Sequence, residues 1–230
     1  MLSGPSCFGV EAVMYYTVQP VVVFLFGLTA IGDDYRQFVM ILEGLITTIN
    51  DGGSVNLSPM GPVVNEAMTH CVLRPFKTSR TYHNLVQRRE AVFHVTDDVE
   101  LIAQSAVAVP DPFPEMKPAE IISGWIIKDA CRWYALQLRS LDDERERSEI
   151  VCEVVGQGRV RDFFGFNRAK HAVLEAAILA TRTKILNGDE IVSEMMRLER
   201  IVGKTAGEKE LRAFQFLQGY IHRALKKEID

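Results

Sequence analysis

The hydrophobic pattern of this chain changes its period near Asn167, and that change limits the folds that the chain can adopt. Before this point, apolar residues form short β-branched runs separated by turn residues, a pattern typical of strands. After it, apolar residues recur with the 3.6-residue period of a helix, as at Ala172, Val173, Ala176 and Ala177. Strands first and helices last indicate an α+β fold. We expect a small, mostly antiparallel β-barrel with two embedded helices, including one over residues 99–107, followed by a C-terminal helical region.

Length and composition describe an ordinary globular chain. The 230 residues are 47% hydrophobic and 24% charged, which is enough to bury a core without disulfides. The formal net charge of −4 gives no electrostatic basis for nucleic acid as a partner. The four cysteines, Cys7, Cys71, Cys131 and Cys152, are scattered without metal-ligand spacing. We therefore expect no metal site, and buried thiols in a reducing, cytoplasmic compartment.

The first 39 residues differ from the rest. Their apolar run over residues 21–26 is too short to span a bilayer, and no Lys or Arg precedes Arg36, as a secretory signal would require. We expect no membrane association. The segment is either a loosely attached appendage or a product of the chosen start codon. The expected division is an N-terminal extension over 1–39, a β-barrel domain over 40–165 and a helical region over 166–230.

Two strands at the front can be placed by their turns. Residues 41–49 predict a strand, and the Asn-Asp-Gly-Gly run at 50–53 predicts a hairpin into the next one. Pro59 and the Gly61-Pro62 pair are expected to break the regular pairing that follows. The charged run 142–147 is interpreted as a solvated hairpin tip and not as a site.

Residues 73–85 join the end of a predicted strand to the start of a predicted helix, and they concentrate cations and hydroxyls. Pro75 disfavours helix at Arg74, whereas Thr78 or Ser79 is a good N-cap. A helix N-terminus attracts anions through its free N–H groups and its dipole. Further charge and donors would come from Arg74, Lys77, Thr78, Ser79 and Thr81. The segment predicts a phosphate site; the alternative is an ordinary capped helix with solvated cations.

A second polar segment covers residues 56–61. Asn56 and Ser58 are two residues apart and share one face of a strand. Pro59 and Gly61 interrupt that strand, which frees backbone amides to face a ligand. Alone, the segment is best explained as a bulged strand. Together with the anion-seeking segment, it indicates a phosphorylated, planar ligand along the barrel wall.

Other chemistries find little support in the sequence. Gly156 and Gly158 lack the third glycine of a dinucleotide fingerprint, and no Walker loop or Gly-x-Ser-x-Gly elbow occurs. His171 and Glu175 lie one helical turn apart, but a metal site would need further ligands. An ion-paired helix face is the better interpretation. His70, His83, His94 and His222 are left as structural or surface residues.

Several segments resemble the FMN-binding split β-barrel superfamily of the flavin reductase type. They are residues 43–50, 56–61, 73–85 and 93–98, and they are similar more narrowly to the branch known as domain of unknown function 447. Residues 166–170, leading into 175–178, resemble the start of that branch's helical region. The resemblance implies a split β-barrel that binds FMN and forms a homodimer with the flavin near the interface.

The resemblance also implies roles for residues. The flavin phosphate would be held by Arg74, Lys77, Thr78 and Ser79, with Thr81 as an additional donor. The isoalloxazine ring would lie near Asn56, Ser58, Pro59, Met60 and Gly61. Phe76 and Asn84 complete the candidate cofactor-binding set. The C-terminal helices, which flavin reductases mostly lack, could cap or reshape the space above the ring.

Three functions remain open from the sequence. The first is an FMN-dependent oxidoreductase of unknown substrate, in which the flavin performs the hydride or electron transfer and no protein acid or base is nominated. The second is a flavin-binding or carrier module without turnover. The third is an accessory protein of a pterin-linked one-carbon pathway.

Overall fold

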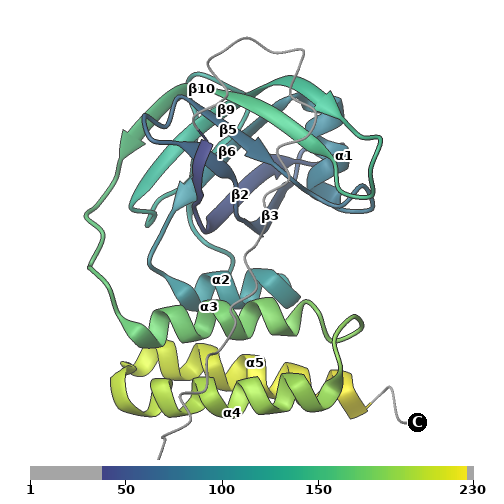
Figure 1. Ribbon diagram of the computed structural model, residues 1–230. Helices are drawn as coiled ribbons and strands as arrows, with labels where there is room; N and C mark the ends of the chain where they lie inside the picture. The colour runs from purple at the N-terminus through teal and green to yellow at the C-terminus, as the bar shows by residue number, and fades with distance from the viewer. Residues whose placement is uncertain (1–37, 227–230) are drawn as a thin grey trace, which may run out of the picture. The chain divides into compact units, whose positions relative to one another are not determined.

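The computed structural model describes residues 38–226, with side chains from Met40 onward, so the N-terminal extension up to residue 37 lies outside the described residues. An eight-stranded sheet curls into a split barrel, and helices follow it in the chain (Figure 1). All strand pairs within this sheet are antiparallel. The expected α+β fold class, a split barrel followed by a helical region, is confirmed.

The element bounds are as follows. The strands are β1 (Phe38–Ile41), β2 (Gly44–Ile49), β3 (Val55–Met60), β4 (Val63–Asn65), β5 (His70–Leu73), β6 (Glu90–Val95), β7 (Met116–Pro118), β8 (Trp125–Ile127), β9 (Arg132–Asp142) and β10 (Glu149–Arg159). The helices are α1 (Arg80–Arg88), α2 (Val99–Val107), α3 (Arg168–Ala180), α4 (Gly188–Thr205) and α5 (Glu208–Lys226). The sheet order is β1-β4-β5-β10-β9-β6-β2-β3, so β3 is an edge strand, and β7 and β8 form a separate ribbon.

Two details of the front strands differ from the prediction. The strand predicted over 41–49 is divided, because β1 ends at Ile41 and pairs with β4, whereas β2 begins at Gly44. Pro59 does not break the pairing: it lies opposite Leu45 within β3. An edge strand tolerates proline because one side of its backbone has no ladder partner. The predicted turn at 50–53 is present, with Asn50 N–H donating to Ser54 O at 2.9 Å.

The barrel encloses an apolar core to which most of its strands contribute. Ile46, Leu73 and Phe93 are at most 1% exposed there, and α1 adds Leu85. His94 is also fully buried. Of the two roles left open by the sequence, structural or surface residue, it therefore has the structural one. The imidazole accepts from Ile127 N–H at Nε2 (3.2 Å) and lies with Nδ1 3.3 Å from Leu45 O. These bonds join β2, β6 and β8.

Helix α2 is not embedded in the barrel as expected. Its Val99 and Ala103 lie in the apolar core of α3, α4 and α5, together with Val173 and Phe214. Its Ile102 faces the other way and packs in a cluster with Leu57 of β3. Figure 1 shows α2 stacked on α3 beneath β2 and β3. Within residues 38–226, no helix is long and apolar enough to cross a membrane.

Polar contacts join the barrel to the helices. Asp97, 6% exposed, accepts from Arg161 (2.6 Å) and from Phe164 N–H (2.8 Å). Lys170 of α3 donates to Asp97 O at 2.8 Å and to Glu210 of α5 at 2.7 Å. These bonds fix the connection between β10 and α3 against the end of β6.

Candidate functional site

Helix α1 begins at the predicted place and has an open N-terminus. Ser79 is its N-cap, with Oγ accepting from Tyr82 N–H at 3.1 Å. The first backbone bond of the helix runs from His83 N–H to Ser79 O, so the N–H groups of Arg80 and Thr81 have no intrahelical acceptor. The first turn contains no acidic residue. The unpaired backbone amides of Arg80 and Thr81 and the positive end of the helix dipole therefore meet at this corner, which suits an anion.

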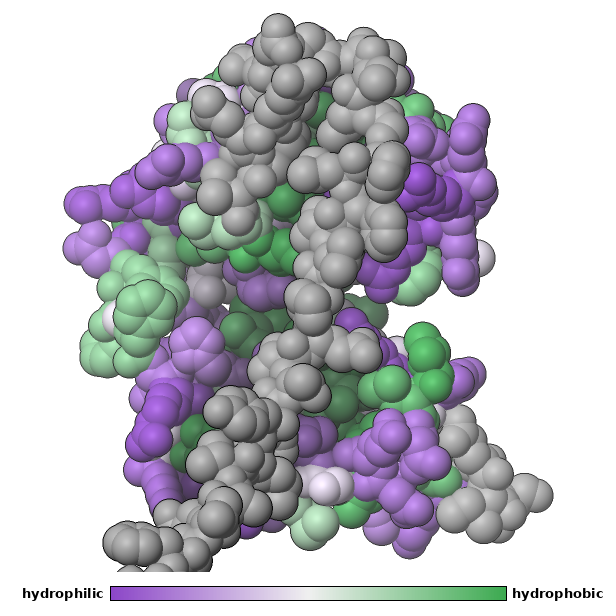
Figure 2. All heavy atoms as spheres, in the orientation of Figure 1, coloured by the Kyte–Doolittle hydropathy of each residue, from purple (hydrophilic) through white to green (hydrophobic). Residues whose placement is uncertain are grey.

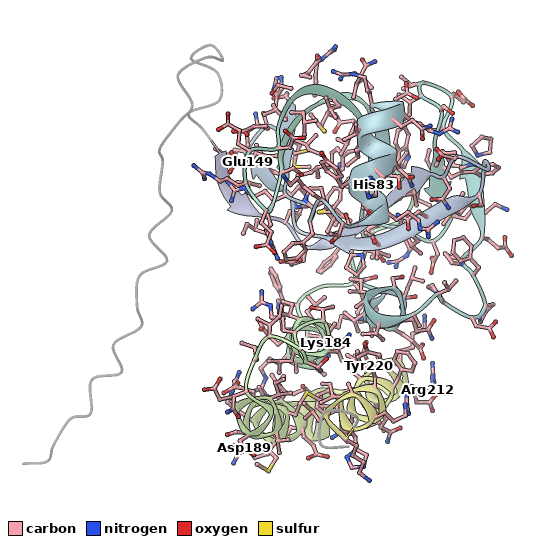
Figure 3. All side chains as sticks on the ribbon, turned by 90° about the vertical axis from the view of Figure 1, so that its right-hand side faces the viewer. His83, Glu149, Lys184, Asp189, Arg212 and Tyr220 are labelled. Atoms are coloured by element: carbon pink, nitrogen blue, oxygen red, sulfur yellow. The ribbon has the colours of Figure 1, made fainter. Side chains whose placement is uncertain are left out.

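The cations of residues 74–77 lie beside this helix start but already have partners. The Arg74 guanidinium lies 3.4 Å from the Glu149 carboxylate, and both side chains are about two-fifths exposed. Lys77 Nζ donates to Asp143 O at 2.8 Å. Thr78 is exposed. Figure 3 looks onto this end of the barrel, where α1 carries His83 and Glu149 marks the start of β10. The same end is largely hydrophilic at the surface (Figure 2).

Thr81 and Asn84 are buried behind the corner. Thr81 Oγ1 accepts from Asn56 Nδ2 at 3.1 Å, and Asn56 Nδ2 also lies 3.2 Å from Thr48 Oγ1. Asn84 Nδ2 donates to the same Thr48 oxygen at 2.9 Å and to Asn50. The structure thus brings the two predicted segments together, since Asn56 of β3 is bonded directly to α1. Thr81 and Asn84 act in the structure as supports of Asn56.

The five residues predicted to lie along the ring are half-buried on or next to edge strand β3. They are Asn56, Ser58, Pro59, Met60 and Gly61. The outer side of an edge strand presents backbone N–H and C=O groups without a ladder partner, which could bond the polar edge of a planar ligand. A Cβ on Gly61 would lie 2.8 Å from the Ile41 side chain and 3.0 Å from the Glu43 carboxylate, so a larger residue here would displace the ends of these side chains.

Glu43 brings a carboxyl to this end of β3. Burial raises its pKa above 4.5, and the negative charge of Glu175 on α3 raises it further. The sequence reading did not select Glu43, because its neighbours in space come from Gly61 and from a helix more than a hundred residues away.

The charged run 142–147 is not simply a solvated tip, as had been expected. Besides holding Lys77, it accepts a bond from Tyr82 Oη to Asp143 Oδ2 at 2.9 Å. Arg147 lies over the ring of Phe76, 4.1 Å from its centre. At the base of the tip, fully buried Ser148 donates from its hydroxyl to Pro75 O at 3.1 Å. No local sequence pattern indicates this docking, because the two loops are separated by about sixty residues or more.

Within residues 38–226, no group of three or more His, Cys, Asp or Glu side chains is arranged so that it could hold a metal ion. His171, one of the pair considered from the sequence, is exposed, and its ring stacks on Phe166 at 6.2 Å.

Comparisons with known proteins add the family. The family model described as "protein of unknown function (DUF447) N-terminal domain" matches residues 42–161. A second model, described as "protein of unknown function (DUF447)", matches residues 167–219. The chain is similar to the crystal structure of an FMN-bound DUF447 protein from Methanosarcina mazei, with 23% identity and a TM-score of 0.67, over 82% of this chain and 97% of that one.

More distant solved structures include a flavin reductase domain protein from Arthrobacter sp. FB24, with 16% identity and a TM-score of 0.47 over 54% of this chain and 80% of that one. Another is an FMN-binding protein from Thermus thermophilus with bound 1-cyclohex-2-enone, with 11% identity and a TM-score of 0.46 over 59% of this chain and 79% of that one. No curated protein matches the chain.

Proposed function

This chain belongs to the DUF447 family, and on that premise we propose that it binds FMN and is a flavin-dependent oxidoreductase. The observation that carries the proposal is the open N-terminus of α1, flanked by Arg74, Lys77 and the hydroxyls of Thr78 and Ser79. Such a corner suits a phosphate group with two negative charges. The FMN-bound Methanosarcina mazei protein, which shares the fold over 97% of its length, supports the choice of ligand.

In this proposal each part of the site binds one part of the cofactor. Arg74, Lys77, Thr78, Ser79 and the first amides of α1 hold the phosphate. Residues 56–61, on edge strand β3 and directly after it, lie along the ring, while Thr81 and Asn84 keep Asn56 in place. Bound FMN supplies the hydride or electron transfer, and the protein supplies position, orientation and local polarity.

The absorbance spectrum of freshly purified protein tests this function. A flavin spectrum that bleaches when NADH or NADPH is added without oxygen supports the oxidoreductase. If no reductant or acceptor changes the flavin spectrum, the protein is a carrier module and not an oxidoreductase. Protein without flavin that also fails to take up added FMN would contradict the binding itself.

We also propose a homodimer with the flavin near the interface. Support for the dimer itself comes from the connection between β10 and α3, where Phe164 and Phe166 are 89% and 93% exposed. The backbone of this connection is held by Asp97 through Phe164 N–H, so the aromatic rings are presented on an anchored loop. Sedimentation equilibrium should give twice the chain mass, and a Phe164→Ser/Phe166→Ser variant should shift toward the monomer; a monomeric wild type would contradict the dimer.

A cytoplasmic location completes the proposal. Cys71, Cys131 and Cys152 are buried free thiols, as expected in a reducing compartment.

A further inference from the structure

Residues 142–148, from the last residue of β9 to the residue before β10, pack against residues 75–77 beside the candidate phosphate site; we call this segment the hairpin tip. It carries four carboxylates and two guanidinium groups. The tip is held at its base, where Ser148 N–H and Oγ both donate to Pro75 O at 3.2 and 3.1 Å. In Figure 1 it lies beside the loop that precedes α1, at the right-hand end of the barrel.

Contacts to the cofactor-binding candidates fix the position of the tip. Main-chain oxygens of Asp143 and Glu146 accept from Lys77, from Nζ at 2.8 Å and from N–H at 3.4 Å. The Asp143 carboxylate accepts from Tyr82 on α1 at 2.9 Å. The negative charge of Asp143 is thus held at the tyrosine hydroxyl that extends from the first turn of α1.

The charge balance favours one small anion at this corner and opposes a longer one. A terminal phosphate would meet Arg74, Lys77 and the open amides of α1, which outweigh the repulsion. A second phosphate linked to the first would extend the negative charge toward the tip, where the Asp143 carboxylate is fixed. Like charges at such distances raise the free energy of the complex, although solvent and salt reduce the effect.

We propose that the hairpin tip is the specificity-determining wall of the phosphate site, and that its carboxylates restrict the ligand to a flavin with a terminal monophosphate, FMN, against the pyrophosphate-linked FAD. This inference rests on the proposed function, because it concerns the same site.

The test compares the dissociation constants of FMN and FAD in the full chain, measured by flavin fluorescence. The variant is Asp143→Asn/Glu146→Gln. It removes two charges but keeps an oxygen acceptor for Tyr82 and leaves the main-chain oxygens that hold Lys77. Glu153→Gln is the matched control, since Glu153 lies on the same strand β10 and pairs with Arg139 away from the tip.

We expect the wild type to prefer FMN, and the double variant to reduce that preference by about fivefold, as two partly solvated charges would. Glu153→Gln should leave the preference unchanged. Raising the salt to roughly 0.5 M should reduce the wild-type preference and have less effect on the double variant.

Two results would overturn the inference, and they are distinguishable. If the wild type binds FMN but the double variant keeps the full preference for FMN over FAD, the tip does not select the ligand, while the proposed function stands. If neither flavin binds any of the proteins, the proposed function is overturned together with the inference.

Discussion

Arg74 is an exposed cation of the candidate phosphate site, and its partner Glu149 would compete with a phosphate bound there. Replacing Arg74 with Ala removes one charge-assisted bond, so FMN binding should weaken by about 1.5 kcal/mol, roughly tenfold. Replacing Glu149 with Gln frees Arg74 from its partner at 3.4 Å, so affinity should rise by about 0.5 kcal/mol. Isothermal titration with FMN measures both changes.

Glu153→Gln serves as the control here too, since it removes a carboxylate from the same strand without touching Arg74. Unchanged FMN affinity in an Arg74→Ala/Thr78→Ala double variant would contradict the assignment of this corner to phosphate.

The buried His94 should make the free energy of unfolding depend on pH. Burial lowers its pKa from 6.5 to about 4, in spite of its backbone hydrogen bonds. The unfolded chain therefore takes up this proton at a higher pH than the folded chain does. The resulting contribution of His94 to the free energy of unfolding is complete above pH 6.5 and is lost as the pH falls toward 4. Its total is about 3 kcal/mol. Urea unfolding between these pH values measures the slope.

A His94→Gln variant should lose that part of the slope, whereas His83→Gln, on the exposed face of α1, should keep it. An equal slope in all three proteins would show that His94 is not the titrating group.

The local structure around the candidate site was predictable from the sequence where the physics is local. The cap at Ser79 follows from side-chain chemistry within four residues, and both polar segments proved to be joined through Asn56 and Thr81. The partners of Arg74 and Lys77 could not be predicted, because Glu149 and Asp143 approach only after β9 and β10 have paired. Glu43 was not predicted either, because its neighbours Gly61 and Glu175 are distant from it in the sequence.

Among the elements, the connection from β10 to α3 is held by the buried Asp97. Burial would raise the pKa of Asp97, but the bonds from Arg161 and from Phe164 N–H more than compensate and lower it. Asp97→Asn should reduce the free energy of unfolding by about 2 kcal/mol, because Arg161 loses its charged partner. Thermal or urea unfolding at neutral pH measures the loss.

Asp162→Asn is the control in the same connection: its pair with Arg159 is largely exposed and should contribute less than about 0.5 kcal/mol. Since the folded pKa of Asp97 lies below its ordinary value of 3.8, the difference in the free energy of unfolding between wild type and Asp97→Asn should be complete above pH 3.8. It should be lost as the pH falls through the folded pKa. A difference that persists in acid would contradict the role of the charge.

The elements themselves were predictable to different degrees. Helix α2 has the predicted bounds, since its apolar spacing and its cap at Asp98 are local signals. Its packing with α3 and α5 was not predicted, because an apolar helix face does not reveal which core it joins. Strand β3 continues through Pro59 since it is an edge, a property of the sheet order that is not visible in the segment alone.

At the scale of the whole molecule, a charge on helix α3 influences a carboxyl group of the barrel, near the end of β3. Glu175 on α3 adds to the raised pKa of Glu43, which lies beside Gly61. Replacing Glu175 with Gln should therefore lower the pKa of Glu43, while the control Glu194→Gln on α4 should not. Carboxyl NMR titration reads Glu43 directly, and an unchanged value in Glu175→Gln would show that the helices do not influence this end of the barrel.

The central claim is that the N-terminus of α1 receives a flavin phosphate, and a crystal structure of the full chain with FMN tests it most directly. We predict phosphate oxygens within hydrogen-bond distance of the Arg80 and Thr81 amides, with Arg74 turned from Glu149 toward the phosphate and the ring along β3. FMN bound elsewhere, or an α1 corner that stays closed by Glu149 and the hairpin tip at saturating FMN, would contradict the account.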